Sequence, residues 1–188
     1  QNYYSLYKCT YNGFSYLLAG VHLPAMSQNV ETRKNIIRAL VQDIKEQEVL
    51  LKNNNTIVIG DFNASPFDDE LIQKDSFNAV LFRNVIMKKE NDIFCGKKYQ
   101  RFYNPMINYI AEATNTYGSY YFSTGSNPLY WYCLDQVLVR KALVDNINNL
   151  FYCKCIKGKN LIKDIAPNKT ISDHLPLIVE FLWEVPND

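Results

Sequence analysis

The stretch that most constrains this chain runs over residues 56–67, Thr-Ile-Val-Ile-Gly-Asp-Phe-Asn-Ala-Ser-Pro-Phe. Its β-branched start follows a polar segment and predicts a short buried strand. Gly60 lets the backbone leave that strand at an angle that other residues resist. Strand alternation then places Asp61 and Asn63 on one side and Phe62 on the other. A carboxylate beside an amide can serve a hard metal, an attacking water or a phosphate oxygen, although these residue types are also common in turns.

Three further polar residues stand at the ends of apolar segments or within them. The chain has two histidines: His22 ends an apolar run, and His174 lies just before the last predicted strand. Asp135 lies within an apolar strand, where an acid usually needs a partner to offset its burial. Taken singly, each residue is better explained by a structural hydrogen bond or a turn. Together with the 56–67 stretch, they make a simple turn a less complete explanation.

Four motifs follow one another in the order Val-His-Leu, Gly-Asp-Phe-Asn, Leu-Asp-Gln-Val-Leu-Val and Ser-Asp-His-Leu-Pro-Leu. In this order they resemble the endonuclease/exonuclease/phosphatase superfamily, which includes pancreatic deoxyribonuclease, apurinic-site endonucleases, neutral sphingomyelinases and inositol polyphosphate 5-phosphatases. The resemblance covers residues 16–182. It implies an α/β (α+β) fold, the four-layer α/β/β/α sandwich of that superfamily. We expect one domain of this type over residues 1–188.

The resemblance also implies a role for each motif residue. Asp173 is expected to bind Mg²⁺ or Mn²⁺, and His174, oriented by Asp135, to donate to the phosphate. We expect an Asp135 oxygen to lie about 2.6–3.2 Å from a ring nitrogen of His174. Asp61 would position or deprotonate the water, and Asn63 would donate to the phosphate or help to hold the metal. The candidate set, expected to converge at one end of the sheet, is His22, Asp61, Asn63, Asp135 and His174 for catalysis, and Asp173, Asp61 and Asn63 for metal.

The chain departs from the family pattern at its start. The family carries a Glu metal ligand on an early strand, whereas this chain begins at the hairpin that leads to His22, so we expect the N-terminal portion of the domain to be missing. His22 would be a second phosphate-facing donor without its usual acidic partner. We reject Gln47-Glu48-Val49 as the ligand motif because it lies in a predicted helix after the His22 strand. We expect weak Mg²⁺ binding, and a second chain or copy covering the incomplete sandwich.

Periodicity and turn signals predict the remaining elements. Asn12-Gly13 predicts a hairpin, and Asn29 is expected to cap a helix that runs to about Leu51. A second helix is expected over residues 68–84. Residues 88–128 read as a loop-rich insertion with a short helix at 104–112. The predicted strands are 3–9, 14–22, 56–60, 134–139, 150–156 and 176–183.

Aromatic residues gather just before the Asp135 strand. They are explained either by sheet and core packing or by a cleft wall that stacks a base or covers a lipid. The set is Tyr117, Tyr120, Tyr121, Phe122, Tyr130, Trp131 and Tyr132.

Composition limits the compartment and the partners. The net charge of +1 shows no general basic field for nucleic acid, although a local patch would not appear in the total. No segment approaches the length of a membrane span, and no signal peptide is visible. Five irregularly spaced cysteines favour free thiols in a reducing compartment, so we expect a cytoplasmic location. The leading hypothesis, which rests on the resemblance, is a bacterial-type intracellular member of the superfamily. Cys153 and Cys155, without a second pair, do not indicate a zinc site.

These observations predict a metal-dependent phosphoesterase that hydrolyses a phosphodiester by in-line water attack. Its substrate would be nucleic acid or a small phosphodiester. Two alternatives remain open at this point. One is a phosphomonoesterase that acts on an inositol phosphate or a nucleotide, and the other is a catalytically inert fragment or binding module.

Overall fold

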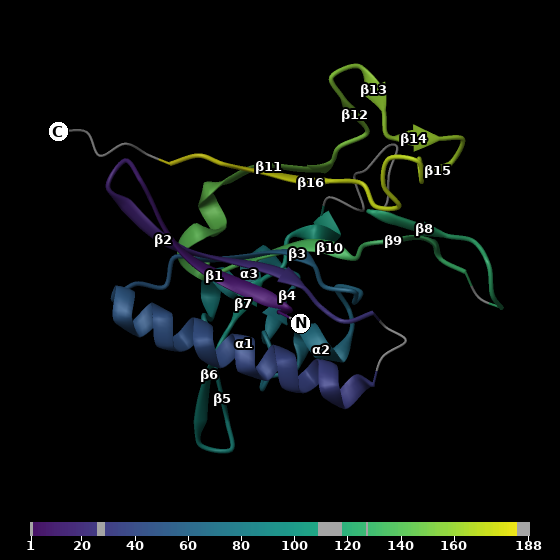
Figure 1. Ribbon diagram of the computed structural model, residues 1–188. Coiled ribbons are helices and arrows are strands. Elements are labelled where there is room, and N and C mark those ends of the chain that lie inside the picture. Colours follow the sequence, from purple (N-terminus) through teal and green to yellow (C-terminus); the bar gives the residue numbers. More distant parts are fainter. Residues whose placement is uncertain (1, 26–28, 109–117, 127, 184–188) are drawn as a thin grey trace.

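The computed structural model describes residues 2–25, 29–108, 118–126 and 128–183. Its centre is a six-stranded sheet in the order β1-β2-β3-β10-β7-β4 (Figure 1). Strands β2 and β3 run parallel, and β3 and β10 run antiparallel. The strands of this sheet are β1 (Tyr4–Tyr11), β2 (Phe14–His22), β3 (Thr56–Asp61), β10 (Asp135–Val139), β7 (Phe102–Tyr103) and β4 (Ala79–Val80).

The first two strands form the predicted hairpin. Tyr11 pairs with Phe14, and the two residues between them, Asn12 and Gly13, have φ angles of 47° and 77°. Two consecutive residues with positive φ make the turn type whose twist matches a two-residue hairpin. The hairpin prediction is therefore confirmed.

Helix α1 (Val30–Leu51) covers one face of the sheet (Figure 1). The Asn29 side chain caps it by accepting a hydrogen bond from the Glu31 N–H at 2.8 Å. Its buried apolar positions pack against β2 and β3 in one core cluster, as the helical periodicity predicts. These positions are Ile37, Leu40, Val41 and Ile44.

The opposite face of the sheet is covered by a second sheet of two antiparallel strands, β11 (Ile147–Tyr152) and β16 (Leu177–Phe181) (Figure 1). A 3₁₀ helix, η1 (Lys141–Asn146), leads from β10 to β11. A second core cluster fills the space between the two sheets. The fold is thus mixed α/β, with helix, sheet and sheet in layers, as in the expected sandwich.

Aromatic stacking covers part of the face that we expected a second chain or copy to cover. Trp183 lies with its ring centroid 4.7 Å from that of Phe14, 5.3 Å from that of Tyr16 and 5.6 Å from that of Phe181. Within the described part of the chain, this face is therefore closed partly by the chain itself. Nothing in the structure supports a second chain there.

The helix predicted over residues 68–84 is wrong. Two short helices, α2 (Asp69–Ile72) and α3 (Arg83–Lys88), stand there, separated by β4. Asn78 has a φ of 48°, which ends helical geometry. Phe77 is fully buried and packs edge-on against other core rings, so tertiary packing overrides the local helical pattern.

The loop-rich insertion predicted over residues 88–128 is also wrong in part. This region holds β7 of the central sheet, a hairpin of β5 (Asn91–Phe94) and β6 (Lys97–Gln100), and strand β8 (Tyr120–Phe122). Strand β8 pairs with β9 (Tyr130–Tyr132), so most of the aromatic set lies on one hairpin. Much of the expected 104–112 helix, and Tyr117, lie outside the described residues.

The predicted 150–156 strand is divided between β11 and the first of two small hairpins. Both hairpins lie beyond the second sheet, with β14–β15 beside β8 (Figure 1). All five cysteines are free, as expected. None of the described helices is long and apolar enough to cross a membrane. The two hairpins consist of β12 (Cys155–Ile156) with β13 (Lys159–Asn160), and β14 (Ile162–Lys163) with β15 (Ala166–Pro167).

A buried ion pair joins α1 to the sheet. Arg140 Nε and Nη2 donate to the two carboxylate oxygens of Glu48 at 2.8 and 3.2 Å, and the Thr56 hydroxyl donates to the same carboxylate at 2.6 Å. The Arg140 guanidinium also lies 3.7 Å from the ring centroid of Phe102. Burial lowers the pKa of Arg140, and the Glu48 carboxylate opposes that shift. Glu48 is therefore a structural residue, in agreement with its rejection as a metal ligand.

Candidate active site

Three of the expected site residues lie side by side on three neighbouring strands. His22 on β2 is paired with Asp61 on β3, and Asp61 is paired with Asp135 on β10. Directly paired residues of neighbouring strands project on the same face of a sheet. His22 Nε2 lies 3.7 Å from Asp61 Oδ2. The sheet register thus brings together residues that are far apart in the sequence.

Gly60 allows β2 and β3 to approach closely beside this row. Its φ of 141° lies in a region that side chains rarely adopt, and a Cβ atom there would lie 2.1 Å from the Val21 carbonyl oxygen. No other residue fits this position without displacing the backbone of β2. The glycine therefore fixes where Asp61 stands, and the following Phe62 is fully buried behind it.

Asn63 orients the Asp61 carboxylate from a left-handed turn, with a φ of 47°. Its backbone N–H donates to Asp61 Oδ1 at 2.8 Å, and its side-chain amide donates to Asp61 Oδ2 at 3.0 Å and to the Leu23 carbonyl at 2.9 Å. The expected strand alternation does not continue to Asn63, although both side chains still meet. The amide nitrogen is engaged within the protein, so this geometry favours an orienting role over donation to a phosphate.

Arg33 supports this turn from behind and was missed by sequence reasoning. It is a buried residue of α1, and its Nη2 donates to the Asn63 carbonyl oxygen at 2.8 Å. Its Nε lies 3.5 Å from a carboxylate oxygen of Glu70. The periodicity of a predicted helix identifies its buried apolar positions only. It therefore does not indicate that a charged residue such as Arg33 is buried and bonds to a loop.

His174 and Asp135 form a close pair. His174 Nδ1 lies 2.7 Å from Asp135 Oδ2, within the expected range. An ionised carboxylate can only accept, so Nδ1 donates and Nε2 is the nitrogen that remains for a ligand. The ring centroid of Tyr120 lies 5.0 Å from that of His174. The aromatic hairpin is thus adjacent to the candidate site.

Ser119 braces both members of this pair. The Asp135 N–H donates to Ser119 Oγ at 3.0 Å, and the Leu175 N–H donates to the Ser119 carbonyl at 2.8 Å. The Tyr152 hydroxyl donates to the Asp135 carbonyl at 2.7 Å. Ser119 is fully buried, and no sequence motif singled it out. One residue therefore joins the backbone of Asp135 to the segment that carries His174.

Burial, hydrogen bonds and neighbouring charges raise two pKa values in the site. Burial raises the pKa of Asp61; the Asn63 backbone N–H lowers it, and the charge of Asp135 raises it further. The hydrogen bond with Asp135 raises the pKa of His174, burial opposes this, and the charges of Asp135, Asp61 and Asp173 add to it. The structure thus favours the protonated form of the His174 imidazole, and its positive charge in turn favours the ionised form of Asp61.

The donor chemistry of the site fits a hard divalent cation. Asp61 and Asn63 lie together, and Asp173 is exposed directly before His174. Among the residues that the structure describes, no group of three or more His, Cys, Asp or Glu is arranged to hold a metal. Mg²⁺ commonly binds through one or two carboxylates, with waters and substrate phosphate oxygens completing its shell. The oxygen donors present fit that mode of binding.

Ser119→Ala is expected to lower the pKa of His174, because loss of the hydroxyl leaves the Asp135 N–H without its acceptor and loosens the 2.7 Å contact. NMR titration of the metal-free protein measures this. Ser76→Ala is the control, since it also removes a buried hydroxyl that is hydrogen-bonded to the backbone, in that case as a donor to the Glu70 carbonyl. The control is expected to leave the pKa of His174 unchanged. Equal shifts in both variants would contradict the bracing role of Ser119.

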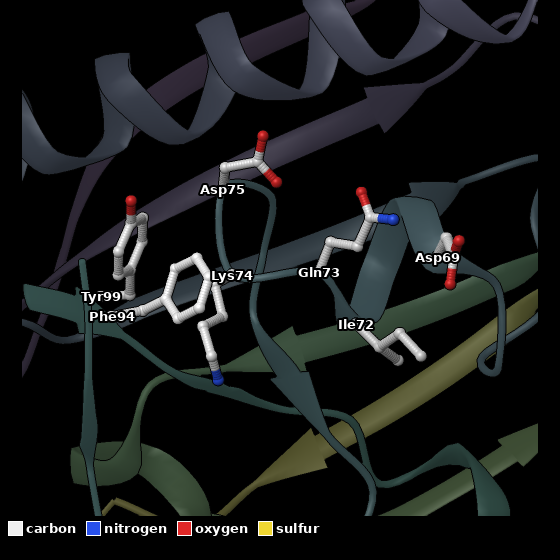
Figure 2. A pocket seen from close by; sticks show the side chains of 7 residues that line it. All are labelled: Asp69, Ile72, Gln73, Lys74, Asp75, Phe94 and Tyr99. Carbon is white, nitrogen blue, oxygen red and sulfur yellow. The ribbon is translucent and has the colours of Figure 1, made fainter. Parts of the chain in front are cut away.

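A separate concavity lies on the side of α2 and the β5–β6 hairpin, where Phe94 and Tyr99 stand side by side (Figure 2). Asp75 pairs there with Arg38 of α1, with Arg38 Nη2 2.9 Å from Asp75 Oδ2. None of the candidate site residues lines this concavity, so it is separate from the candidate active site. Its lining consists of Asp69, Ile72, Gln73, Lys74, Asp75, Phe94 and Tyr99.

Fold and site together define a class of protein, an α/β sandwich that gathers carboxylates and histidines at one end of the strands of its central sheet. The chain belongs to the Endonuclease/Exonuclease/phosphatase family, whose family model matches residues 5–174. A comparison with curated proteins finds no match.

Among the solved structures with similar folds are three from Enterococcus and Neisseria. A conserved protein of unknown function from Enterococcus faecalis V583 is 21% identical, with a TM-score of 0.48, and the match covers 96% of this chain and 55% of that one. The 3′ phosphatase NExo from Neisseria, bound to a product DNA hairpin, is 12% identical with a TM-score of 0.47, and the match covers 89% and 61%. The 3′–5′ exonuclease NExo from Neisseria meningitidis is 13% identical with a TM-score of 0.50, and the match again covers 89% and 61%. This chain therefore spans between 55% and 61% of the length of these structures.

Proposed function

We propose that this protein is a divalent-metal-dependent phosphoesterase that hydrolyses a phosphodiester by in-line attack of water. The observation that supports this most is the 2.7 Å contact between His174 and Asp135, since Asp135 is itself paired in register with Asp61. A carboxylate-supported imidazole next to a second carboxylate provides the donor and the base that ester hydrolysis requires. Family membership supports the same class of reaction.

In the proposed reaction, Asp61 orients the attacking water and accepts its proton, and Asn63 holds the Asp61 carboxylate in place. As the new bond to phosphorus forms, the bond to the leaving oxygen opposite the water breaks, and that oxygen takes a proton from solvent. Protonated His174 donates from Nε2 to a phosphoryl oxygen, while Asp135 fixes the tautomer and stabilises the positive charge. His22 is a second donor to the phosphate. A divalent cation at Asp61, Asn63 and Asp173 would supply charge neutralisation on the phosphoryl oxygens.

The proposed substrate is nucleic acid or a small phosphodiester. The similar fold of a 3′–5′ exonuclease from Neisseria meningitidis supports nucleic acid as the proposed substrate. We also propose a cytoplasmic location, because all five cysteines are free, as is usual in a reducing compartment.

Hydrolysis of bis-p-nitrophenyl phosphate and of single-stranded DNA with Mg²⁺ or Mn²⁺ tests the proposal. Asp61→Asn and His174→Ala are each expected to lower the rate at least ~100-fold, because each removes a group that moves a proton in the reaction. Asp75→Asn, which alters an exposed acid on the far concavity, is the control and is expected to keep the wild-type rate. Chelation of the metal is expected to abolish hydrolysis. Wild-type rates in Asp61→Asn and His174→Ala, or no hydrolysis by the wild type, would overturn the proposal.

A further inference from the structure

We propose that residues 153–171, here called the lysine lobe, bind the phosphate backbone of a single-stranded nucleic acid that extends from the active site. This inference rests on the proposed function and names its substrate class. The lobe contains the β12–β13 and β14–β15 hairpins, of which β14–β15 lies beside β8 (Figure 1).

The lysine lobe is strongly positive, although the net charge of the whole chain is close to zero. It contains five lysines and one acid, Asp164, and so carries +4, whereas the whole chain carries +1 and the rest of it therefore −3. Asp173 stands just beyond the lobe. No acidic residue in the described part of the chain forms an ion pair with any of the five lysines. Four of them are exposed and Lys154 is half-buried; the five are Lys154, Lys157, Lys159, Lys163 and Lys169.

The lobe adjoins the catalytic pair directly. Ile156, Leu161 and Ile171 of the lobe line a small pocket together with His174 and Pro176. Strand β15 of the lobe also contacts β8 of the aromatic hairpin. A polyanion with one phosphate at His174 therefore has unpaired lysines within reach of its next phosphates. Neutralisation of phosphates by lysines is the main source of affinity for nucleic acids.

The aromatic hairpin provides surfaces for bases on the same side. Tyr120, whose ring lies 5.0 Å from that of His174, stacks on Phe122 with 6.5 Å between centroids and 14° between ring planes. Phe122 is 44% exposed. The Tyr120 and Phe122 rings therefore extend from beside the His174 imidazole to the solvent. Aromatic rings beside a basic groove stack unpaired bases with little regard to sequence. Since a base in a duplex does not present its face, the arrangement favours a single strand.

A lipid surface fits these observations less well. Binding to an anionic membrane needs apolar side chains that project together among the lysines. Ile156, Ile165 and Ile171 are 43%, 66% and 52% exposed. Ile156 and Ile171 line the pocket beside His174, whereas Ile165, at the turn between β14 and β15, does not, so the three do not form one apolar surface. Phosphatidylserine vesicles therefore serve as the competing probe in the test.

The test compares two variants with the same change in charge. The lobe variant replaces Lys157, Lys159, Lys163 and Lys169 with Gln. The control replaces four exposed lysines outside the lobe, Lys8, Lys88, Lys97 and Lys98. Binding of fluorescent oligothymidylate is measured by anisotropy with chelator present, over a range of salt concentrations, and hydrolysis of bis-p-nitrophenyl phosphate is measured separately.

We expect the lobe variant to bind oligothymidylate at least ~10-fold more weakly at low salt, and its dependence of log affinity on log salt to be less steep by about 3, for four lost phosphate contacts. The control is expected to bind within about twofold of wild type, because its lysines lie outside the path of the strand. Phe122→Ala is expected to weaken binding of the oligonucleotide and not of inorganic polyphosphate. Both lysine variants should unfold at the wild-type temperature and hydrolyse the small substrate at the wild-type rate.

Equal losses in the two lysine variants would overturn the lobe proposal, because net charge alone would then explain binding. Tighter binding of duplex than of single strands, or lobe-dependent binding of vesicles with none of oligothymidylate, would also overturn it. These outcomes leave hydrolysis of the small substrate untouched. Conversely, lobe-dependent binding without any hydrolysis would overturn the proposed function and leave the binding surface standing.

Discussion

Asp135→Asn is expected to move the whole pH–rate profile to lower pH. In the proposed reaction Asp61 acts as a carboxylate and His174 as an imidazolium, so activity requires a pH above the first pKa and below the second. Asp135 raises both pKa values, that of His174 chiefly through their hydrogen bond and that of Asp61 through its charge. Replacing the carboxylate with an amide therefore lowers both limits. The rate at the optimum is expected to fall about 100-fold, because the imidazolium loses its support.

NMR titration of the metal-free protein separates this effect from a loss of folding. The dispersion of the amide resonances in the same spectra shows whether the variant is folded. The same shift predicts a change in stability. A raised pKa of His174 in the folded state stabilises the protein at pH values below the unfolded pKa, and this contribution disappears as the pH rises through the folded pKa. Asp135→Asn should therefore destabilise the protein at acidic pH more than at alkaline pH. An unchanged pKa of His174 in this variant would refute the account.

Arg140→Met is expected to lower the free energy of unfolding by about 3–5 kcal/mol, because it leaves the Glu48 carboxylate buried without its partner. Arg140 and Glu48 are 1% and 5% exposed, and the two hydrogen bonds between them join α1 to β10. Arg140 also donates to the Gln100 and Arg101 carbonyls, at 3.2 and 3.1 Å, which lose a donor in the variant. Denaturant unfolding measures the change.

Two controls make this prediction specific. In the double variant Glu48→Gln/Arg140→Met no charge is left buried, so much of the lost stability should return. Arg83→Ala removes an ion pair with Asp145 whose side chains are both exposed, and it should barely change the unfolding midpoint. A double variant as unstable as Arg140→Met alone would show that packing around the guanidinium, rather than the unpaired carboxylate, determines the loss.

The parts of the fold that sequence reasoning predicted correctly are those fixed by local chemistry. Asn12-Gly13 favours one turn geometry. The Asn29 cap marks where the helix begins, and the apolar periodicity after it marks which face of the helix is buried. Both arise within a few residues, so no knowledge of distant packing is needed. The segments over 68–84 and 88–128 were misread because β4 and β7 are two-residue strands whose pairing partners lie elsewhere in the sequence.

The candidate site shows the same division. His22, Asp61 and Asp135 could be named from strand ends and motif order, and their register now places them side by side. Ser119 and Arg33 could not be named, because they act through hydrogen bonds to backbone groups of residues distant in the sequence. Such contacts leave no periodic or compositional signal. They become visible only when the tertiary structure brings the partners together.

The insertion of β10 between β3 and β7 has a consequence for synthesis of the protein. On the ribosome, β1, β2 and β3 can pair as soon as they emerge, but one edge of β3 stays open until residue 139 has been made. An open edge of apolar β-branched residues is a site for wrong pairing between nascent chains. His174 emerges later still, so the acid–imidazole pair forms only after the sheet has closed. Recovered hydrolysis is therefore expected to be among the last signals to return when the denatured protein refolds.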